Sequence, residues 1–260
     1  MRDILSDMNE KSLQERDPMR DVQKQTALPK RFYKDVSVAR DGEEFVILLD
    51  GKTVKTPAKK SLSIASEVIA NAAAAEWRAQ EELIDPAKMP ITRMTNTTID
   101  GVADNPDAVF EEIVKFSGTD LLFYRAESPS GLVALQAEHW DPVIDWAANN
   151  LGARFVLTEG IMHVNQPSEA IKAYANALRR YSSPLALTGL HSATTLTGSA
   201  LLGLSIAEQQ LTAEEAWAAA HVDEDWNISQ WGTDDEAEKR RLFRWADMQA
   251  ACLLIENSSS

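Results

Sequence analysis

Apolar and polar residues alternate over residues 31–64, as they do in strands that bury one face. The runs VSVA, EFVILL and KTVKT are separated by the pairs Asp41-Gly42 and Asp50-Gly51. Asp-Gly pairs favour type I′ turns, because both central positions of such a turn need a positive φ. We therefore predict a three-stranded meander with an Asp-Gly pair at the centre of each turn.

From Ser66 the apolar period changes to that of a helix. Ile69, Ala73 and Trp77 recur at intervals of four residues and share one face, which we expect to cover the meander. The next segment, residues 84–102, contains two prolines and many threonines. It predicts a long loop or short extended pieces, with a domain boundary near Gly101.

The rest of the chain has mainly helical periodicity. Its most unusual part is the charge-free segment 181–207, which is too rich in Ser, Thr and Gly for a membrane-spanning helix. We predict a buried helix there, with Ser183 as N-cap and Pro184 at its first position. The predicted fold class is α+β. It consists of a mobile arm (1–30), a small β-meander and α part (31–101) and an all-helical part (102–260).

Two helix-start motifs near the C-terminus predict an αα-hairpin. Thr212 with Glu215, and Thr233 with Glu236, have the spacing of capping boxes, and only Trp231-Gly232 interrupts the helical pattern between them. Two antiparallel helices joined by a tight turn follow from this spacing.

Each hairpin helix carries one charged residue on its apolar face. On the first helix, Glu224 lies in the middle of a stripe that includes Ile228 and Trp231, and on the second, Arg241 interrupts the apolar stripe. Both charges lie at about the same distance from Gly232. One interpretation is therefore a buried Glu224–Arg241 ion pair that fixes the hairpin register.

The alternative interpretation is an exposed patch that binds a partner protein. Aromatic and apolar anchors around one charge are typical of interface hot spots. Trp226 lies about 180° from Glu224 on the helix, so a two-helix unit cannot bury both tryptophan faces. The pattern alone leaves both interpretations open.

Charge and cysteine content restrict the function. The net charge is −14, and residues 101–260 hold 23 acidic against 10 basic residues. Such a field repels phosphate backbones and anionic lipids, so we expect a protein partner, no nucleic acid and no membrane insertion. The single cysteine, Cys252, excludes a disulfide framework and fits the cytoplasm.

Motifs of catalysis are missing from the sequence. There is no Gly-rich phosphate loop, no GxSxG and no HExxH, and the four histidines lie on separate predicted elements. We therefore predict a protein that is not an enzyme, with no catalytic residue, metal site or cofactor. A hydrolase with an unrecognised Ser/His/Asp site stays open as an alternative, because triads assemble in space.

Several motifs together resemble a known family. RFYKDVSV with LDGKTVKTP, AAAEWRAQ, MPITRMTNTTID, TDLLFYRAESP, QAEHWDPVIDW and DEDWNISQWGTDDEA occur in the order typical of the ATP-twelve family. Its members are assembly chaperones that bind the α subunit of the catalytic head of the F-type ATP synthase. The resemblance covers about residues 30 to 255 and agrees with the two-part fold.

The resemblance also implies roles for residues. Glu224 is carried over as essential and Trp77 as important to the fold, and Asp223, Trp231 and Gly232 match the family pattern as further partner-binding candidates. The helix projection given above adds Trp226 to these candidates, and the predicted ion pair makes Arg241 structural. The chain departs from the family pattern at Asn227 and Ser229, where Gln and Glu are usual. A bacterial, alphaproteobacterial member is implied, and a scaffold for another partner is the remaining alternative.

Overall fold

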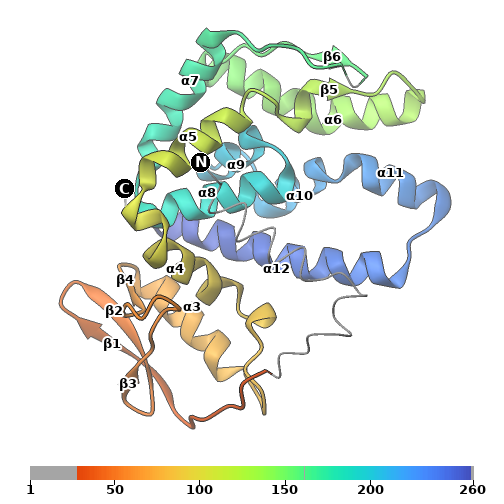
Figure 1. Ribbon diagram of the computed structural model, residues 1–260. Helices are drawn as coiled ribbons and strands as arrows, with labels where there is room; N and C mark the ends of the chain where they lie inside the picture. Colours follow the sequence, from red (N-terminus) through yellow and green to blue (C-terminus); the bar gives the residue numbers. More distant parts are fainter. Residues whose placement is uncertain (1–27, 161, 259–260) are drawn as a thin grey trace.

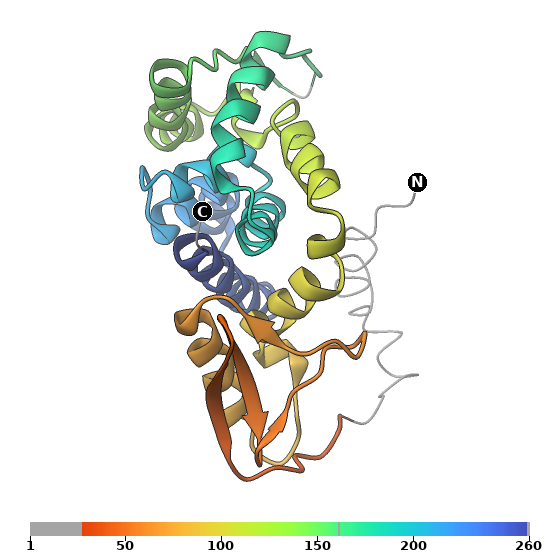
Figure 2. The same cartoon turned by 90° about the vertical axis from the view of Figure 1, so that its left-hand side faces the viewer.

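The computed structural model describes residues 28–160 and 162–258. A small sheet with one covering helix forms one end of the molecule, and the helices that follow in the chain form the larger remainder (Figures 1 and 2). The predicted α+β class is confirmed. The arm predicted over residues 1–30 lies outside the described residues except for its last three.

The meander is present with one addition. Strands β1 (Val36–Asp41), β2 (Glu44–Leu49) and β3 (Lys52–Thr53) are antiparallel neighbours. A fourth strand, β4 (Ser63–Ile64), also pairs with β2. The sequence pattern did not predict β4.

The two Asp-Gly pairs behave differently. Asp50 and Gly51 both have positive φ (48° and 77°), as the predicted turn requires. At the first turn, however, Asp41 pairs with Glu44 inside the strands. The turn residues there are Gly42 and Glu43, so the predicted turn centre is wrong by one residue. The register places Val36 and Val38 opposite Leu49 and Ile47, and pairing these apolar side chains determines where the turn falls.

Helix α3 (Glu67–Arg78) covers the sheet, as predicted. Ile69 and Ala73 are fully buried in the cluster that joins the helix to the strands. Trp77 is half-buried, and its ring meets the ring of Tyr33 edge-on at 5.7 Å between centroids. The Tyr33 hydroxyl also donates a 2.7 Å hydrogen bond to the carbonyl of Trp77.

Residues 84–102 do not form the predicted loop, because most of them belong to helix α4 (Pro90–Asp100). Pro90 stands at the first helical position, where it needs no amide donor. Thr92, Thr95 and Thr98 form the buried face, and the last two donate their hydroxyls to carbonyls one turn earlier. This internal hydrogen bonding lets a threonine face be buried in a helix, which the composition of the segment concealed.

The larger part of the molecule is helical, with two short parallel strands. Its elements are α5 (Pro106–Phe116), β5 (Tyr124–Arg125), α6 (Ser130–Trp146), β6 (Thr158–Glu159), α7 (Ser168–Leu178), α8 (Pro184–Thr197), α9 (Ala200–Ala207), α10 (Ala213–Ala220), α11 (Val222–Trp231) and α12 (Asp235–Asn257).

The charge-free segment is buried, as predicted, but it forms two helices. Ser183 caps α8 and Pro184 stands at its first position. Gly198 then ends α8 in the left-handed conformation (φ 69°), and Ser199 caps α9. No helix within the described residues is both long and apolar enough to cross a membrane.

Helices α8 and α12 pack closely at the centre of the helical part. A Cβ atom on Gly189 would come within 2.7 Å of the backbone oxygen of Ala251. Buried apolar side chains form one cluster in the helical part and a second between the sheet and α3, with α4 between them. The domain boundary near Gly101 stays a prediction.

Candidate functional site: the open face of helix α11

The first helix of the predicted hairpin is interrupted at His221. The capping box of Thr212 and Glu215 starts α10 as predicted, but α10 ends at Ala220 and α11 begins at Val222. The His221 backbone leaves helical geometry (φ −115°, ψ 16°), while its side-chain Nδ1 lies 2.8 Å from the carbonyl oxygen of Trp217. Helix α11 is therefore a separate helix and not a continuation of α10.

The start of the second hairpin helix also differs from the prediction. Asp234, rather than Thr233, is the N-cap of α12, and its carboxylate accepts hydrogen bonds from the amides of Glu236 and Ala237. These bonds lower the pKa of Asp234. The predicted Thr233 capping box is therefore wrong, because an ionised aspartate one residue later satisfies two amides of the first turn.

One side of α11 is held against α6. Gln136 of α6 donates a 2.7 Å hydrogen bond to the carboxylate of Asp223. The ring of Trp226 lies over Gly131, where a Cβ atom would come within 2.5 Å of the ring. Asp223 and Trp226 thus position α11. The sequence pattern did not predict this structural role for them.

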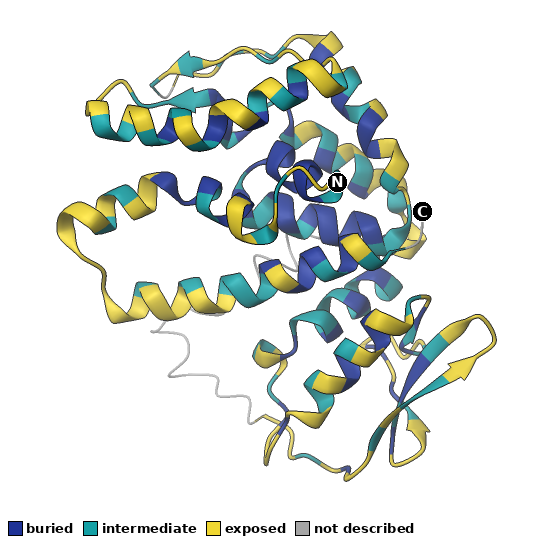
Figure 3. Ribbon diagram, turned by 180° about the vertical axis from the view of Figure 1, so that it is seen from behind, coloured by how far each residue is buried: buried dark blue, intermediate teal, exposed yellow. Residues whose placement is uncertain are grey.

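The opposite side of α11 is open. At 100° per residue, Glu224, Ile228 and Trp231 fall within about 60° of one another and point away from the Trp226 side. Trp231 is 86% exposed, and the Glu224 side chain is 43% exposed. The end of the hairpin, including Gly232, is mostly exposed (Figure 3). A large aromatic ring so open to solvent is uncommon in a folded chain.

The expected Glu224–Arg241 ion pair does not form. Arg241 of α12 binds Asp225 instead, through two hydrogen bonds, of which the one from Nη2 to Oδ2 measures 3.0 Å. These bonds raise the pKa of Arg241. Arg241 lies opposite this part of α11, as the spacing from Gly232 predicted. Asp225 rather than Glu224 points toward α12, because it lies 100° further round α11 than Glu224.

Glu224 keeps only a weak partner of its own. Its Oε2 atom lies 3.8 Å from Nε2 of His221. Burial of the imidazole lowers the pKa of His221, so this histidine is neutral at pH 7. The exposed carboxylate of Glu224 is therefore available to a basic group from outside.

A small apolar notch of about 250 Å³ lies beside α12. It is lined by Trp217 and Trp245, with 5.4 Å between their ring centroids, and by Leu242, which is 66% exposed. Glu238 and Arg241 complete it. The notch adds a second apolar feature to the hairpin.

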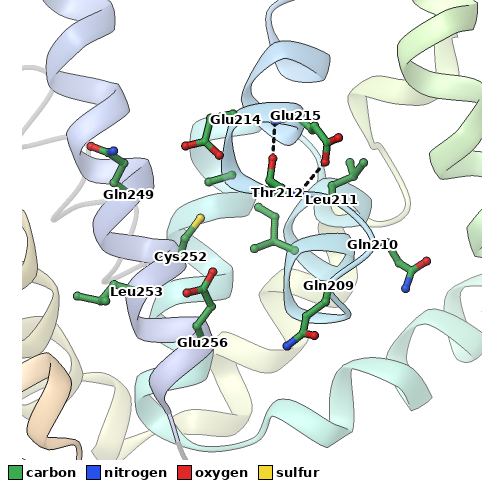
Figure 4. Close-up of a pocket in the computed structure, with 12 residues that line it drawn as sticks. Gln209, Gln210, Leu211, Thr212, Glu214, Glu215, Gln249, Cys252, Leu253 and Glu256 are labelled. Carbon is green, nitrogen blue, oxygen red and sulfur yellow. Dashed lines mark hydrogen bonds between the residues drawn. The ribbon is translucent and has the colours of Figure 1, made fainter.

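A larger hollow of about 500 Å³ separates the α9–α10 connection from α12 (Figure 4). The carboxylate of Glu215 in its wall is already bound to the amide of Thr212. The Cys252 thiol faces the hollow, and burial raises its pKa to about 12, so it is not a nucleophile at neutral pH. Over the described residues, no group of three or more ligating side chains could hold a metal ion.

Histidine contacts give no support to the hydrolase alternative. His163 contacts Asn165 and Tyr124, His191 lies 3.3 Å from Glu112, and His221 bonds a backbone carbonyl. Within residues 28–160 and 162–258, no histidine is hydrogen-bonded to a serine or an aspartate. The side-chain pattern of a catalytic triad is thus not assembled there.

Three structurally important residues were not predicted from the sequence. Asp120 is fully buried and binds the amides of Leu122 and Leu201, which joins the α5–α6 connection to the start of α9. Burial raises its pKa to about 6. Gln136 and Gly131 position α11. Only Asp120 left a signal in the sequence, as a lone acid directly before the apolar run LLFY.

The fold is a mostly helical body that presents an exposed acidic and aromatic helix face. Comparison with known proteins agrees. Residues 30–148 match the model of the family described as ATP12 chaperone protein. The mitochondrial protein atp12 of Schizosaccharomyces pombe is 23% identical over a 225-residue alignment, which covers 81% of this chain and 76% of the yeast protein.

Two solved structures are closer in sequence. Atp12 of Paracoccus denitrificans is 37% identical, with a TM-score of 0.79 over 89% of this chain and 99% of its own. The Atu1473 protein of Agrobacterium tumefaciens is 53% identical, with a TM-score of 0.85 over 98% of this chain and 96% of its own. The chain belongs to the ATP12 chaperone family. It is an assembly chaperone of the ATP synthase and not an enzyme.

Proposed function

We propose that the chain binds the unassembled α subunit of the catalytic head of the F-type ATP synthase through the open face of α11. The observation that carries this proposal is the 86% exposed Trp231 beside the exposed Glu224. Burying a ring of this size under a partner protein is favourable, because it removes a large apolar surface from water. The face therefore has the composition of a hot spot rather than of a solvated helix surface.

The chaperone acts by covering apolar surface. An α subunit without its β neighbour exposes the surface that the two subunits share, and such surface aggregates. The chaperone covers that surface until β displaces it. No nucleotide hydrolysis or cofactor is required, because exchange of one partner for another needs only a difference in affinity.

We place this activity in a bacterial cytoplasm. The one cysteine is buried and forms no disulfide, which fits a reducing compartment. The acidic second half keeps the chaperone away from anionic membranes and nucleic acids, and attracts basic protein surfaces.

Within the proposed site, the residues have different roles. Glu224 and Trp231 contact the partner, and Gly232 lets the chain leave α11 with a φ of 82°. Asp223 and Trp226 contribute by holding α11 on α6, so that its other face is presented.

Affinity capture tests the proposal. The tagged full-length chain is incubated with host lysate at low salt, and bound proteins are identified by mass spectrometry. We expect the α subunit with the wild-type chain and with the control Glu43→Lys, which makes the same charge change on an exposed turn of the sheet. Glu224→Lys should lose the subunit while the free energy of unfolding changes by less than about 2 kcal/mol.

Two outcomes would contradict the proposal. If the wild-type chain captures no α subunit, the client is another protein and the scaffold alternative takes its place. If Glu224→Lys captures the subunit as well as wild type does, the binding face lies elsewhere. Glu224→Gln, which keeps the shape of the side chain, replaces Glu224→Lys if the lysine variant does not fold.

A further inference from the structure

The charged residues around the tip of the hairpin are all acidic. Residues 222–238 contain seven acidic residues and no Lys or Arg. The two arginines that the structure pairs with this segment are already engaged, because Arg241 binds Asp225 and Arg240 lies 3.6 Å from Glu236. A molecule that covers the open face must therefore bring its own positive charge.

The residues of the open face are also spaced as on a surface that packs against another helix. Glu224, Ile228 and Trp231 follow one another at i, i+4 and i+7, so they form a ridge along α11. Ridges of this kind pack into the groove of another helix, whereas an extended strand has no matching repeat. The ten residues of α11 span about 15 Å, which is the length of three turns.

We propose that the open face of α11 binds a basic amphipathic helix of about three turns in the partner protein. Its apolar side packs against Trp231 and Ile228, and a Lys or Arg on its flank reaches the carboxylate of Glu224. The contacts of Asp223 and Trp226 with α6 hold α11 still, so the face is preformed and little conformational entropy is lost on binding. The proposal refines the function given above and rests on it for the identity of the client only.

Synthetic peptides test the helix directly. The probe is a fluorescein-labelled 14-residue peptide of Leu and Lys, with leucines at i, i+3, i+4 and i+7, and binding to the full-length chain is followed by anisotropy. The first comparison peptide replaces every Lys with Glu. The second has the same composition in an order that destroys the helical period, so it tests charge without amphipathicity.

Four variants locate the contact. We expect Trp231→Ala and Glu224→Lys each to weaken binding of the basic peptide by about tenfold or more. Two controls make comparable changes at the other end of the molecule: Val68→Ala truncates a 52% exposed apolar residue of α3, and Glu43→Lys reverses an exposed charge. Both should bind as wild type does. The acidic peptide should bind Glu224→Lys better than it binds wild type.

Cross-linking gives a second readout that does not depend on affinity. Trp231→Cys is labelled with a maleimide photocrosslinker, and the buried Cys252 is not expected to compete for the reagent. The basic peptide should become attached at position 231 and not to the control Val68→Cys.

Several results would overturn the proposal. One is that the scrambled peptide binds as tightly as the amphipathic one, because the attraction would then be bulk charge. Another is that Trp231→Ala and Glu224→Lys bind the basic peptide like wild type. A concentration-dependent dimer in analytical ultracentrifugation that Trp231→Ala abolishes would assign the face to a second copy of the chain.

Failure of the helix and failure of the client can be distinguished. If the peptides bind as expected but lysate capture yields no α subunit, the proposed binding of a basic helix is supported and the α subunit is rejected as the partner. If the α subunit is captured but the peptides do not bind the open face, the α subunit is supported as the partner and the proposed binding of a basic helix is rejected.

Discussion

Arg241 binds Asp225 across the hairpin with both terminal nitrogens of its guanidinium, and it leaves Glu224 outside the pair. Asp225 and Glu224 are neighbours in the chain but point in directions 100° apart. One carboxylate therefore joins the two helices of the hairpin, and the other stays on the exposed side of α11. This difference between the two residues supports the binding face proposed above.

Two double-mutant cycles measure how strongly Arg241 interacts with Asp225 and with Glu224. Asp225→Ala and Arg241→Ala should show a coupling of about 0.5–1 kcal/mol in the free energy of urea unfolding, since the pair is bidentate but its side chains are 46% and 25% exposed. Glu224→Ala with Arg241→Ala should show a smaller coupling, because Glu224 acts on Arg241 through charge alone and makes no hydrogen bond to it. Equal coupling in both cycles would mean that Arg241 exchanges between the two carboxylates.

Gly189 provides a test of the central packing. Helix propensity alone predicts that Gly189→Ala stabilises the chain by up to about 1 kcal/mol. The added Cβ would, however, meet backbone atoms of α12 at 2.7 Å and 3.2 Å, and backbone cannot move aside without shifting the helix. We therefore expect the variant to lose about 1–3 kcal/mol in urea unfolding. An increase in stability would show that α8 and α12 can separate slightly at no cost.

Much of the fold could be predicted because it follows local rules. The second Asp-Gly turn, the Ser183 cap and the Thr212 capping box depend on residues within four positions of each other, and all three are confirmed. Helix α4 was missed because its threonines are buried by packing against distant elements. The break at His221 has no local glycine or proline to mark it.

The candidate site was predictable only in part. The apolar stripe with Glu224 at its centre was visible from periodicity, and so was the approximate level of Arg241. The sequence could not tell which of two adjacent carboxylates faces α12, because a break at His221 changes the direction of α11. Nor could it reveal that α6 supports α11, since Gly131 and Trp226 are 95 positions apart.

Trp77 should stabilise the sheet end of the molecule through its ring and not through its indole nitrogen. The ring packs on Tyr33, while the buried Nε1 has no hydrogen-bond partner among the described residues. Trp77→Ala should cost about 3 kcal/mol in urea unfolding, because it leaves a cavity. Trp77→Phe should cost less than about 1.5 kcal/mol, since it keeps the ring contact and removes an unsatisfied donor. Similar losses for both variants would reveal a role for the nitrogen.

Asp120 should make stability depend on pH. Burial raises its pKa in the folded chain from 3.8 to about 6, although four hydrogen-bond donors favour the ionised form. Between these two pH values the folded state binds more protons than the unfolded state. The free energy of unfolding is therefore higher below pH 4 and falls as the pH rises through 6, by about 3 kcal/mol in total.

The contribution of Asp120 can be isolated by difference. Urea unfolding of wild type and Asp120→Asn is measured from pH 4 to pH 7.5, and their difference should shrink as the pH rises, because asparagine does not titrate. Asp107→Asn, which removes an exposed carboxylate at the start of α5, controls for the loss of one charge from this acidic chain. A difference between wild type and Asp120→Asn that stays constant with pH would mean that the hydrogen bonds from Leu122 and Leu201 offset the burial of the charge.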